Sequence, residues 1–282
     1  FTNMTQDFSG SATSPSAVTI YDSGVLEICG DFYATLTLAA HDVVVKGSPG
    51  GYFSSLDAAG SDHVISMAFP NSVISIENLL ITGGYAMDGG GIFNPQNPNG
   101  NNSITISGCE ITGNHAWDDG GGIHFYNAEL TIMDSLIHGN SSDNSGAGIY
   151  VKDNPVVLET TEVYENQCQN GGGLYISNGH LQMTDTRIYD NEATSSGGGI
   201  YSGGTDIVMY DSFIENNVTN TYGGAIMLDT GTLTCTASTD HSAGILGNTG
   251  GYGGGFWVQT NGGDTSYEII SNHCDWGTDL DG

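Results

Sequence analysis

A short glycine-rich motif recurs along most of this chain, and each copy is followed by one large apolar residue. Clear copies are GGGI at residues 89–92, 120–123 and 197–200. The apolar residue returns about every 26 residues, at Ile92, Ile123, Ile149, Leu174, Ile200, Ile226 and Phe256. A fixed period of this size is typical of stacked-repeat proteins, in which one repeat cannot bury its apolar face without its neighbours.

Two further apolar columns repeat in phase with the first. The nearer one contains Ile81, Ile111, Ile137, Val163, Ile188, Ile214, Ile245 and Ile269, and the other contains Ile76, Ile106, Ile132, Leu158, Met183 and Met209. Apolar and polar residues alternate around these positions, as in Leu130-Thr131-Ile132, which indicates short strands rather than helices. Three strands and three turns per repeat predict an all-β fold, a parallel β-helix (solenoid) of about ten coils with ~26 residues per coil.

An asparagine follows the nearer column by three residues in almost every repeat. These residues are Asn114, Asn140, Asn166, Asn191, Asn217, Asn248 and Asn272. Stacked side-chain amides can hydrogen-bond to one another, as in the Asn ladders of cross-β structures, and Asn also tolerates the left-handed backbone of a sharp turn. We therefore expect a structural Asn ladder at one corner. The glycine runs should form another corner, where positive φ and close approach of successive coils favour glycine.

The repeat pattern divides the chain into three parts. Residues 81–282 carry the regular array, and residues 31–80 show the alternation expected of opening coils. Residues 1–30 begin with a Ser/Thr-rich stretch and are expected to form an N-terminal arm or cap. That arm could cover the first coil, because solenoid ends need capping, or it could pair as a strand with a neighbouring subunit.

The charge balance excludes two classes of partner. The 282 residues include 32 Asp and Glu but only 3 Lys and Arg, which gives a formal net charge of −29. Nucleic acids and anionic membranes are bound through clusters of basic residues, so neither is expected as a partner. No segment has the ~18 apolar residues of a transmembrane segment. The chain starts at Phe1 without a basic leader region, as a processed or trimmed protein would.

The order I-x-x-N, a small residue and then GG(G/A)I, over residues 81–272, resembles the repeats of polymorphic outer membrane proteins. Those autotransporter-type surface proteins carry GGAI and FxxN motifs, and Ile or Val replaces the Phe of FxxN in this chain. The resemblance implies a right-handed β-helix passenger, secretion, and adhesion or surface display. We therefore expect an extracellular or cell-surface structural or adhesive protein.

Two kinds of partner fit this expectation. One is self-association, head to tail, into a surface filament, because the open ends of a β-helix offer unpaired strand edges. The other is a cell-surface or glycan ligand on a stripe of residues that follow the first apolar column and should face solvent. The stripe contains Phe93, His124, Tyr150, Tyr175, Tyr201, Met227 and Trp257. The same column could instead serve only to stack side chains and stabilise the strand face.

Acidic residues precede the early glycine runs and are the candidate metal ligands. They are Asp88, Asp118, Asp119 and Asp143. Coils stack ~4.8 Å apart, so oxygens from neighbouring turns could share Ca²⁺. The alternative is an acidic face that serves only solubility.

A carbohydrate-active enzyme, a polysaccharide lyase or hydrolase on the same scaffold, is the alternative function. Lys46, Lys152 and Arg187 lie in different coils, which disfavours a site for an acidic polysaccharide. A glycosidase needs two carboxyl groups ~5–9.5 Å apart, and on so acidic a surface such pairs arise by chance. We therefore expect no catalysis. Among the five cysteines, Cys235–Cys274 is the one pairing to test, and the others should mostly be buried.

Overall fold

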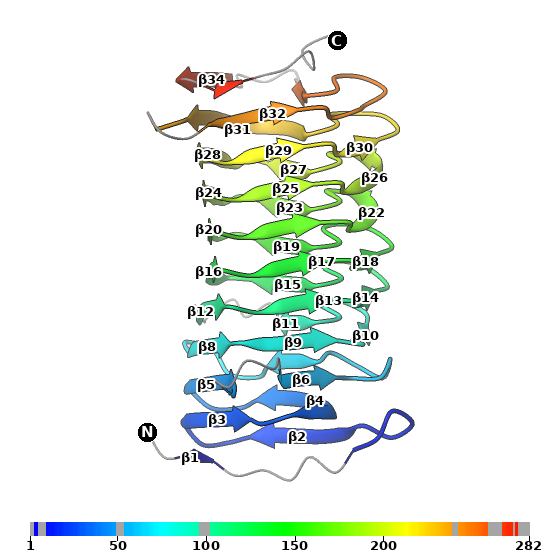
Figure 1. Ribbon diagram of the computed structural model, residues 1–282, viewed down its shortest axis with the longest axis vertical. Coiled ribbons are helices and arrows are strands. Elements are labelled where there is room, and N and C mark those ends of the chain that lie inside the picture. The colour runs from blue at the N-terminus through cyan, green and yellow to red at the C-terminus, as the bar shows by residue number, and fades with distance from the viewer. Residues whose placement is uncertain are drawn as a thin grey trace.

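The structure, a computed structural model, describes residues 10–48, 54–95, 102–238 and 242–258, and the backbone of 3–4, 267–272 and 274–275. All regular elements of these residues are strands, and the strands pair in parallel from coil to coil. Figure 1 shows the coils stacked from the N-terminus at one end to the C-terminus at the other. The predicted all-β parallel β-helix is confirmed. No helix in the described part could cross a membrane.

Three long sheets run the length of the stack. Sheet I follows the glycine runs and contains β2 (Ser16–Ile20), β4 (Asp31–Leu38), β7 (Ile65–Met67), β11 (Ile92–Asn94), β15 (Ile123–Tyr126), β19 (Ile149–Lys152), β23 (Leu174–Ser177), β27 (Ile200–Gly203), β31 (Ile226–Thr236) and β33 (Phe256–Val258). Sheet II joins the start of β4 to β6 (Ser54–Asp57), β9 (Leu79–Thr82), β13 (Glu110–Thr112), β17 (Leu136–His138), β21 (Glu162–Tyr164), β25 (Arg187–Tyr189), β29 (Phe213–Glu215), β32 (Ala243–Leu246) and β35 (Cys274–Asp275).

Sheet III closes each coil. It contains β1 (Asn3–Met4), β3 (Gly24–Ile28), β5 (Asp42–Gly47), β8 (Val73–Glu77), β12 (Asn102–Ser107), β16 (Ala128–Met133), β20 (Pro155–Glu159), β24 (His180–Thr184), β28 (Asp206–Tyr210), the second half of β31, and β34 (Tyr267–Asn272). The three apolar columns lie in register inside the coil. Ile92 pairs with Ile123 in sheet I, and all members of these columns whose burial is described, apart from Phe256, are buried.

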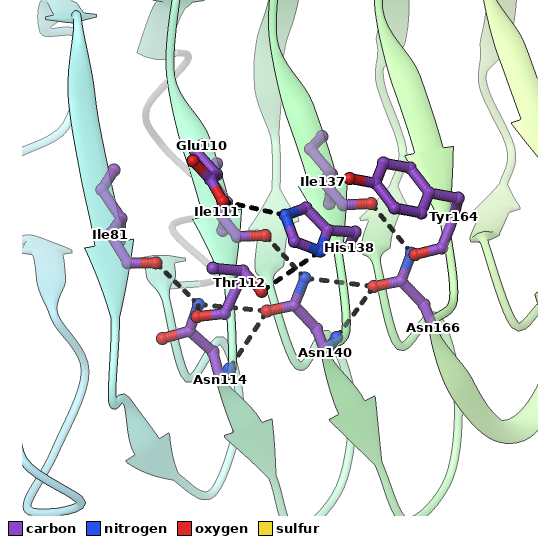
Figure 2. A network of polar contacts seen from close by, with 10 residues as sticks. All are labelled: Ile81, Glu110, Ile111, Thr112, Asn114, Ile137, His138, Asn140, Tyr164 and Asn166. Carbon is purple, nitrogen blue, oxygen red and sulfur yellow. Dashed lines mark hydrogen bonds and ion pairs between the residues drawn. The ribbon is translucent and has the colours of Figure 1, made fainter. Parts of the chain in front are cut away.

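The Asn ladder forms as predicted (Figure 2). The backbone N–H of Asn114 donates to Oδ1 of Asn140 at 3.1 Å, and that of Asn140 donates to Oδ1 of Asn166 at 3.0 Å. Nδ2 of Asn140 donates to the carbonyl of Ile111, one coil back, at 2.9 Å. The same contacts continue through Asn191 and Asn217 to Asn248, and each amide is buried.

The left-handed residue of this corner is not the asparagine itself, which corrects the expectation from the sequence. Instead the residue before each asparagine has a positive φ. These residues are Gly83, Gly113, Gly139, Glu165, Asp190, Asn216 and Gly247, the first preceding Gly84 in the first repeat. The asparagine keeps an ordinary backbone conformation, which lets its side chain point along the stack.

Two features of the fold differ from the expected layout. The repeats contain a fourth strand beyond the three expected, because the small residues two positions after the ladder asparagines, such as Ala116 and Ser142, lie in a fourth parallel sheet, sheet IV. It contains β10 (Tyr85–Ala86), β14 (His115–Ala116), β18 (Ser141–Ser142), β22 (Gln167–Asn170), β26 (Glu192–Ser196) and β30 (Val218–Thr219). In addition, β2 and β3 already pair with β4 and β5, so coil stacking begins within the segment expected to be an arm.

The cysteines separate into bonded and free groups. Cys235 is buried and disulfide-bonded, while Cys29, Cys109 and Cys168 are free. Cys109 and Cys168 are buried as expected, and Cys29 is exposed. The side chain of Cys274, the partner predicted for Cys235, lies outside the described residues.

Candidate functional site

The glycine corner brings Asp88 and Asp119 together in successive coils. Each residue directly precedes the first glycine of a run, and the coils are in register, with Gly89 N–H donating to the carbonyl of Asp119 at 3.0 Å. The backbone N–H of Asp119 lies 3.3 Å from Oδ1 of Asp88, and that of Ser145 lies 3.0 Å from Oδ1 of Asp119. One oxygen of each carboxylate is therefore held by the backbone of the next coil.

The other two predicted metal ligands point elsewhere. Oδ1 of Asp118 accepts a hydrogen bond from Nδ2 of Asn144 at 3.1 Å. Asp143 is exposed, and its Oδ1 lies 3.9 Å from Nε2 of His115. The four aspartates thus belong to three different columns, and the structure does not assemble them into one oxygen-rich site.

His124, predicted for the aromatic stripe, also lies close to Asp88 and Asp119. It lies on β15, five residues after Asp119, with Gly120 between them at a φ of +69°. A Cβ atom on Gly120 would lie 2.6 Å from Cβ of His124, which shows how closely the corner folds back onto the outer face of sheet I. The glycine therefore positions the carboxylate against the imidazole.

The three side chains form a compact cluster. One potential metal-ligand atom from each side chain lies within 4.8 Å of the other two, and Nε2 of His124 is 3.9 Å from Oδ1 of Asp88. His124 is only 1% exposed, and its buried Nδ1 has no hydrogen-bond partner. A buried polar atom without a partner costs about 1–3 kcal/mol of stability, so this nitrogen lacks the hydrogen bond that its burial requires.

Burial shifts all three titrations away from the charged forms. Burial raises the pKa of Asp119 to about 6, and the charges of Asp118 and Asp88 act in the same direction. Burial also raises the pKa of Asp88. Burial lowers the pKa of His124 to about 3, so the imidazole is neutral at neutral pH and keeps a nitrogen lone pair.

The aromatic column on the outer face of sheet I does stack, but it is not the solvent-facing stripe that the sequence predicted. Ring centroids are 4.8 Å apart for His124–Tyr150, 5.0 Å for Tyr150–Tyr175 and 4.7 Å for Tyr175–Tyr201. His124 and Tyr150 are buried, in part because Tyr126 covers them, with its ring centroid 4.9 Å from that of His124 and its hydroxyl 3.4 Å from that of Tyr150.

The two ends of the column behave differently. Phe93 is half-buried, and its ring centroid is 4.4 Å from that of His63 in the preceding coil and 5.5 Å from that of His124. Met227 is buried and interrupts the aromatic series. Trp257, half-buried, contacts Tyr222 of the glycine corner at 5.1 Å. The column therefore stabilises the strand face and offers little continuous surface.

A second aromatic stack, on sheet II, was not identified from the sequence. His138, Tyr164 and Tyr189 stack with centroids 4.6 and 4.9 Å apart, and His138 Nε2 lies 3.0 Å from Oε1 of Glu110. Figure 2 shows His138 and Tyr164 beside the Asn ladder. The signal was present, because each of these residues directly follows a member of the nearer apolar column.

Two exposed aromatic side chains lie next to each other at sheet IV, one on β10 and one directly after β14, and sequence reasoning missed this pair. Tyr85 and Trp117 are 41% and 52% exposed, and their ring centroids are 5.2 Å apart. His115 stacks on Tyr85 at 4.9 Å. The next coils of the same sheet form a shallow polar depression of about 310 Å³, lined by Ser141, Ser142, Asp143, Gln167, Cys168, Gln169 and Thr194.

Comparison with known proteins gives no family. No protein-family model matches the chain, and no curated protein matches it. Among solved structures, a DFA-IIIase from Arthrobacter chlorophenolicus A6, in complex with GF2, is similar over 90% of this chain and 82% of that one, with 11% identity and a TM-score of 0.35. A similarity this weak carries no argument about activity.

Proposed function

We propose that the protein is an extracellular or cell-surface adhesive β-helix that binds a neutral glycan along sheet IV. The observation that carries the proposal is the alignment of exposed aromatic rings with a polar depression in the same strand columns. Parallel pairing places Tyr85, His115, Ser141 and Gln167 in one row along the helix axis. A linear ligand lying along this axis would meet both surfaces.

The two surfaces offer the contacts that a sugar chain requires. Trp117 and Tyr85 present amphipathic rings on which the apolar face of a sugar ring can pack, while their polar atoms remain solvated. Gln167, Gln169 and Asp143 supply amide and carboxylate groups that can bond to hydroxyls. Ring packing with a few polar groups that fix orientation is the usual composition of a small-molecule binding surface.

The charge of the chain restricts the glycan class. With a formal net charge of −29, the surface repels polyanions, so a neutral polysaccharide is favoured over a uronate-containing or sulfated one. The disulfide of Cys235 supports an extracellular location, because structural disulfides persist in oxidising compartments.

Binding can be tested by co-sedimentation of the protein with insoluble neutral polysaccharides and by a glycan array that includes acidic glycans. We expect retention on a neutral glycan and about tenfold weaker binding of Trp117→Ala, the loss expected for one stacking contact of ~1.4 kcal/mol. Tyr210→Ala is the matched control, because Tyr210 is 42% exposed but lies on sheet III. Equal retention of both variants, or preference for acidic glycans, would contradict the proposal.

The enzyme alternative is favoured by one observation, the paired carboxyl groups of Asp88 and Asp119. A carboxyl with its pKa raised to about 6, as in Asp119, could donate a proton near neutral pH, and its neighbour could act as base or nucleophile. Incubation with the same polysaccharides distinguishes the two functions. If the wild-type protein releases reducing ends and the Asp119→Asn variant does not, the protein is an enzyme. If the polysaccharides remain unchanged, the adhesive function is favoured.

A further inference from the structure

The cluster of Asp88, Asp119 and His124 lies at the glycine corner, beside sheet IV but outside the proposed glycan face. It combines two carboxylates from successive coils with one imidazole from sheet I. Oδ1 of each carboxylate accepts a hydrogen bond from a backbone N–H of the next coil, and the side chain of Ser145 also interacts with the Asp119 carboxylate. Each carboxylate keeps lone pairs that can bind a further group.

The imidazole is held in place and lacks a partner. Its ring is stacked against Tyr150 at 4.8 Å and 4° and contacted by Phe93 on the other side. The 3.9 Å between Nε2 and Asp88 is too long for a hydrogen bond, and Nδ1 is buried without any partner. The stacking contacts hold the ring with Nε2 toward Asp88, and neither ring nitrogen has a hydrogen-bond partner among the described residues.

A cation of the right type could bind one oxygen of each carboxylate and one nitrogen of the imidazole. Ca²⁺ takes six to eight oxygen ligands, and the corner supplies only two carboxylates because Asp118 and Asp143 point elsewhere. Imidazole and carboxylate together suit Zn²⁺ and related divalent transition metals. Ligands of a tetrahedral site lie ~3.4 Å apart at ~2.1 Å from the ion, so small side-chain rotations would close the cluster.

We propose that Asp88, Asp119 and His124 bind one divalent transition-metal ion of the Zn²⁺ class. The side chain of Asp88 is 30% exposed, which leaves a path for the ion and positions for water. The backbone N–H groups of Asp119 and Ser145 orient the two carboxylates, as outer-shell hydrogen bonds do in metal sites. The site joins two successive coils at the glycine corner.

The test is isothermal titration calorimetry of the full chain, purified without a histidine tag and stripped with a chelator, using ZnCl₂ and separately CaCl₂. We expect one Zn²⁺ per chain, bound about tenfold or more tightly than Ca²⁺. Asp119→Asn and His124→Phe should each weaken Zn²⁺ binding about tenfold or more. Phe is a suitable replacement because Phe93 fills the same stack in the preceding coil.

Asp143→Asn is the matched control, because it removes one negative charge from the same surface outside the cluster and should leave the Zn²⁺ affinity unchanged. Circular dichroism checks that each variant folds, and Asp119→Asn gives an isosteric second variant if His124→Phe does not fold. Equal affinity for Zn²⁺ and Ca²⁺ would overturn the proposal. So would Zn²⁺ binding that survives in the folded cluster variants or falls equally in Asp143→Asn.

Discussion

The backbone N–H of Asn140 donates to Oδ1 of Asn166, one coil along the stack, at 3.0 Å, and Nδ2 of Asn140 donates to the same oxygen at 3.1 Å. Nδ2 also bonds to the carbonyl of Ile111, one coil back. A single buried amide thus joins three successive coils. The ladder satisfies backbone groups at a corner where the sheet hydrogen bonds are interrupted, and it is therefore part of the core.

Replacing Asn140 by Ala should strongly destabilise the fold. The substitution leaves the buried Asn114 N–H without its partner and removes the amide contact to the Ile111 carbonyl, and one buried orphan costs about 1–3 kcal/mol, so we expect a loss of about 1–3 kcal/mol. Chemical denaturation measures the change. Asn220→Ala is the control, because Asn220 is exposed, and equal losses in the two variants would show that the ladder does not stabilise the fold.

Gly120→Ala should destabilise the protein by about 2 kcal/mol or more. The residue would have to keep a φ of +69°, and its Cβ would lie 2.6 Å from that of His124. Gly203→Ala is the control, because its Cβ would meet its nearest atom at 3.5 Å and its φ is not positive. Thermal unfolding should show a lower midpoint for the first variant alone. A small change in both would mean that the corner can open.

The tyrosine stack should make the protein sensitive to alkali. Burial raises the pKa of Tyr175 to about 12, above its value of about 10 in the unfolded chain. Between these values the folded state binds more protons, so this stabilisation is complete below pH 10 and is lost as the pH rises toward 12. Denaturant unfolding of the wild type and of Tyr175→Phe across this range measures the effect. We expect the variant, which keeps the ring, to lose stability less steeply.

Head-to-tail assembly is open to a direct measurement. The free edge of β2 pairs with no other strand in the described part of the chain, and such edges template pairing with a further copy. We expect species larger than the monomer to grow with concentration in sedimentation velocity. Because β2 belongs to the coil stack, the informative truncation removes residues 1–9 and leaves that strand intact. A monomer at all concentrations would exclude the filament.

The apolar and asparagine ladders could be predicted because the same residue type returns at the same position of each repeat. Ile111 and Ile137 occupy the same position in successive repeats, and the alternation of apolar and polar residues predicts that their side chains point into the core. The burial of His124 and Tyr150 could not be predicted from that alternation. Their side chains do point away from the core, but the glycine corner and Tyr126 fold over them.

Part of the cluster of Asp88, Asp119 and His124 could be predicted from the sequence. Counting back from the first glycine of each run places Asp88 and Asp119 in one column and separates Asp118 from them. His124 joins this cluster only because Gly120 has a positive φ, so that the turn folds back against the strand that follows it. A pattern of residue types does not specify such a reversal.

Unshifted pairing between the middle coils, such as Ile137 with Val163, has a consequence for how this molecule could change over time. Because each of these coils presents the same corners to its neighbours, duplication of one coil would keep every ladder in register. The rod would grow by about 4.8 Å, the distance between paired strands. Duplication of a coil-coding segment in the gene would therefore change the length of the rod by one coil at a time, while its cross-section stays the same.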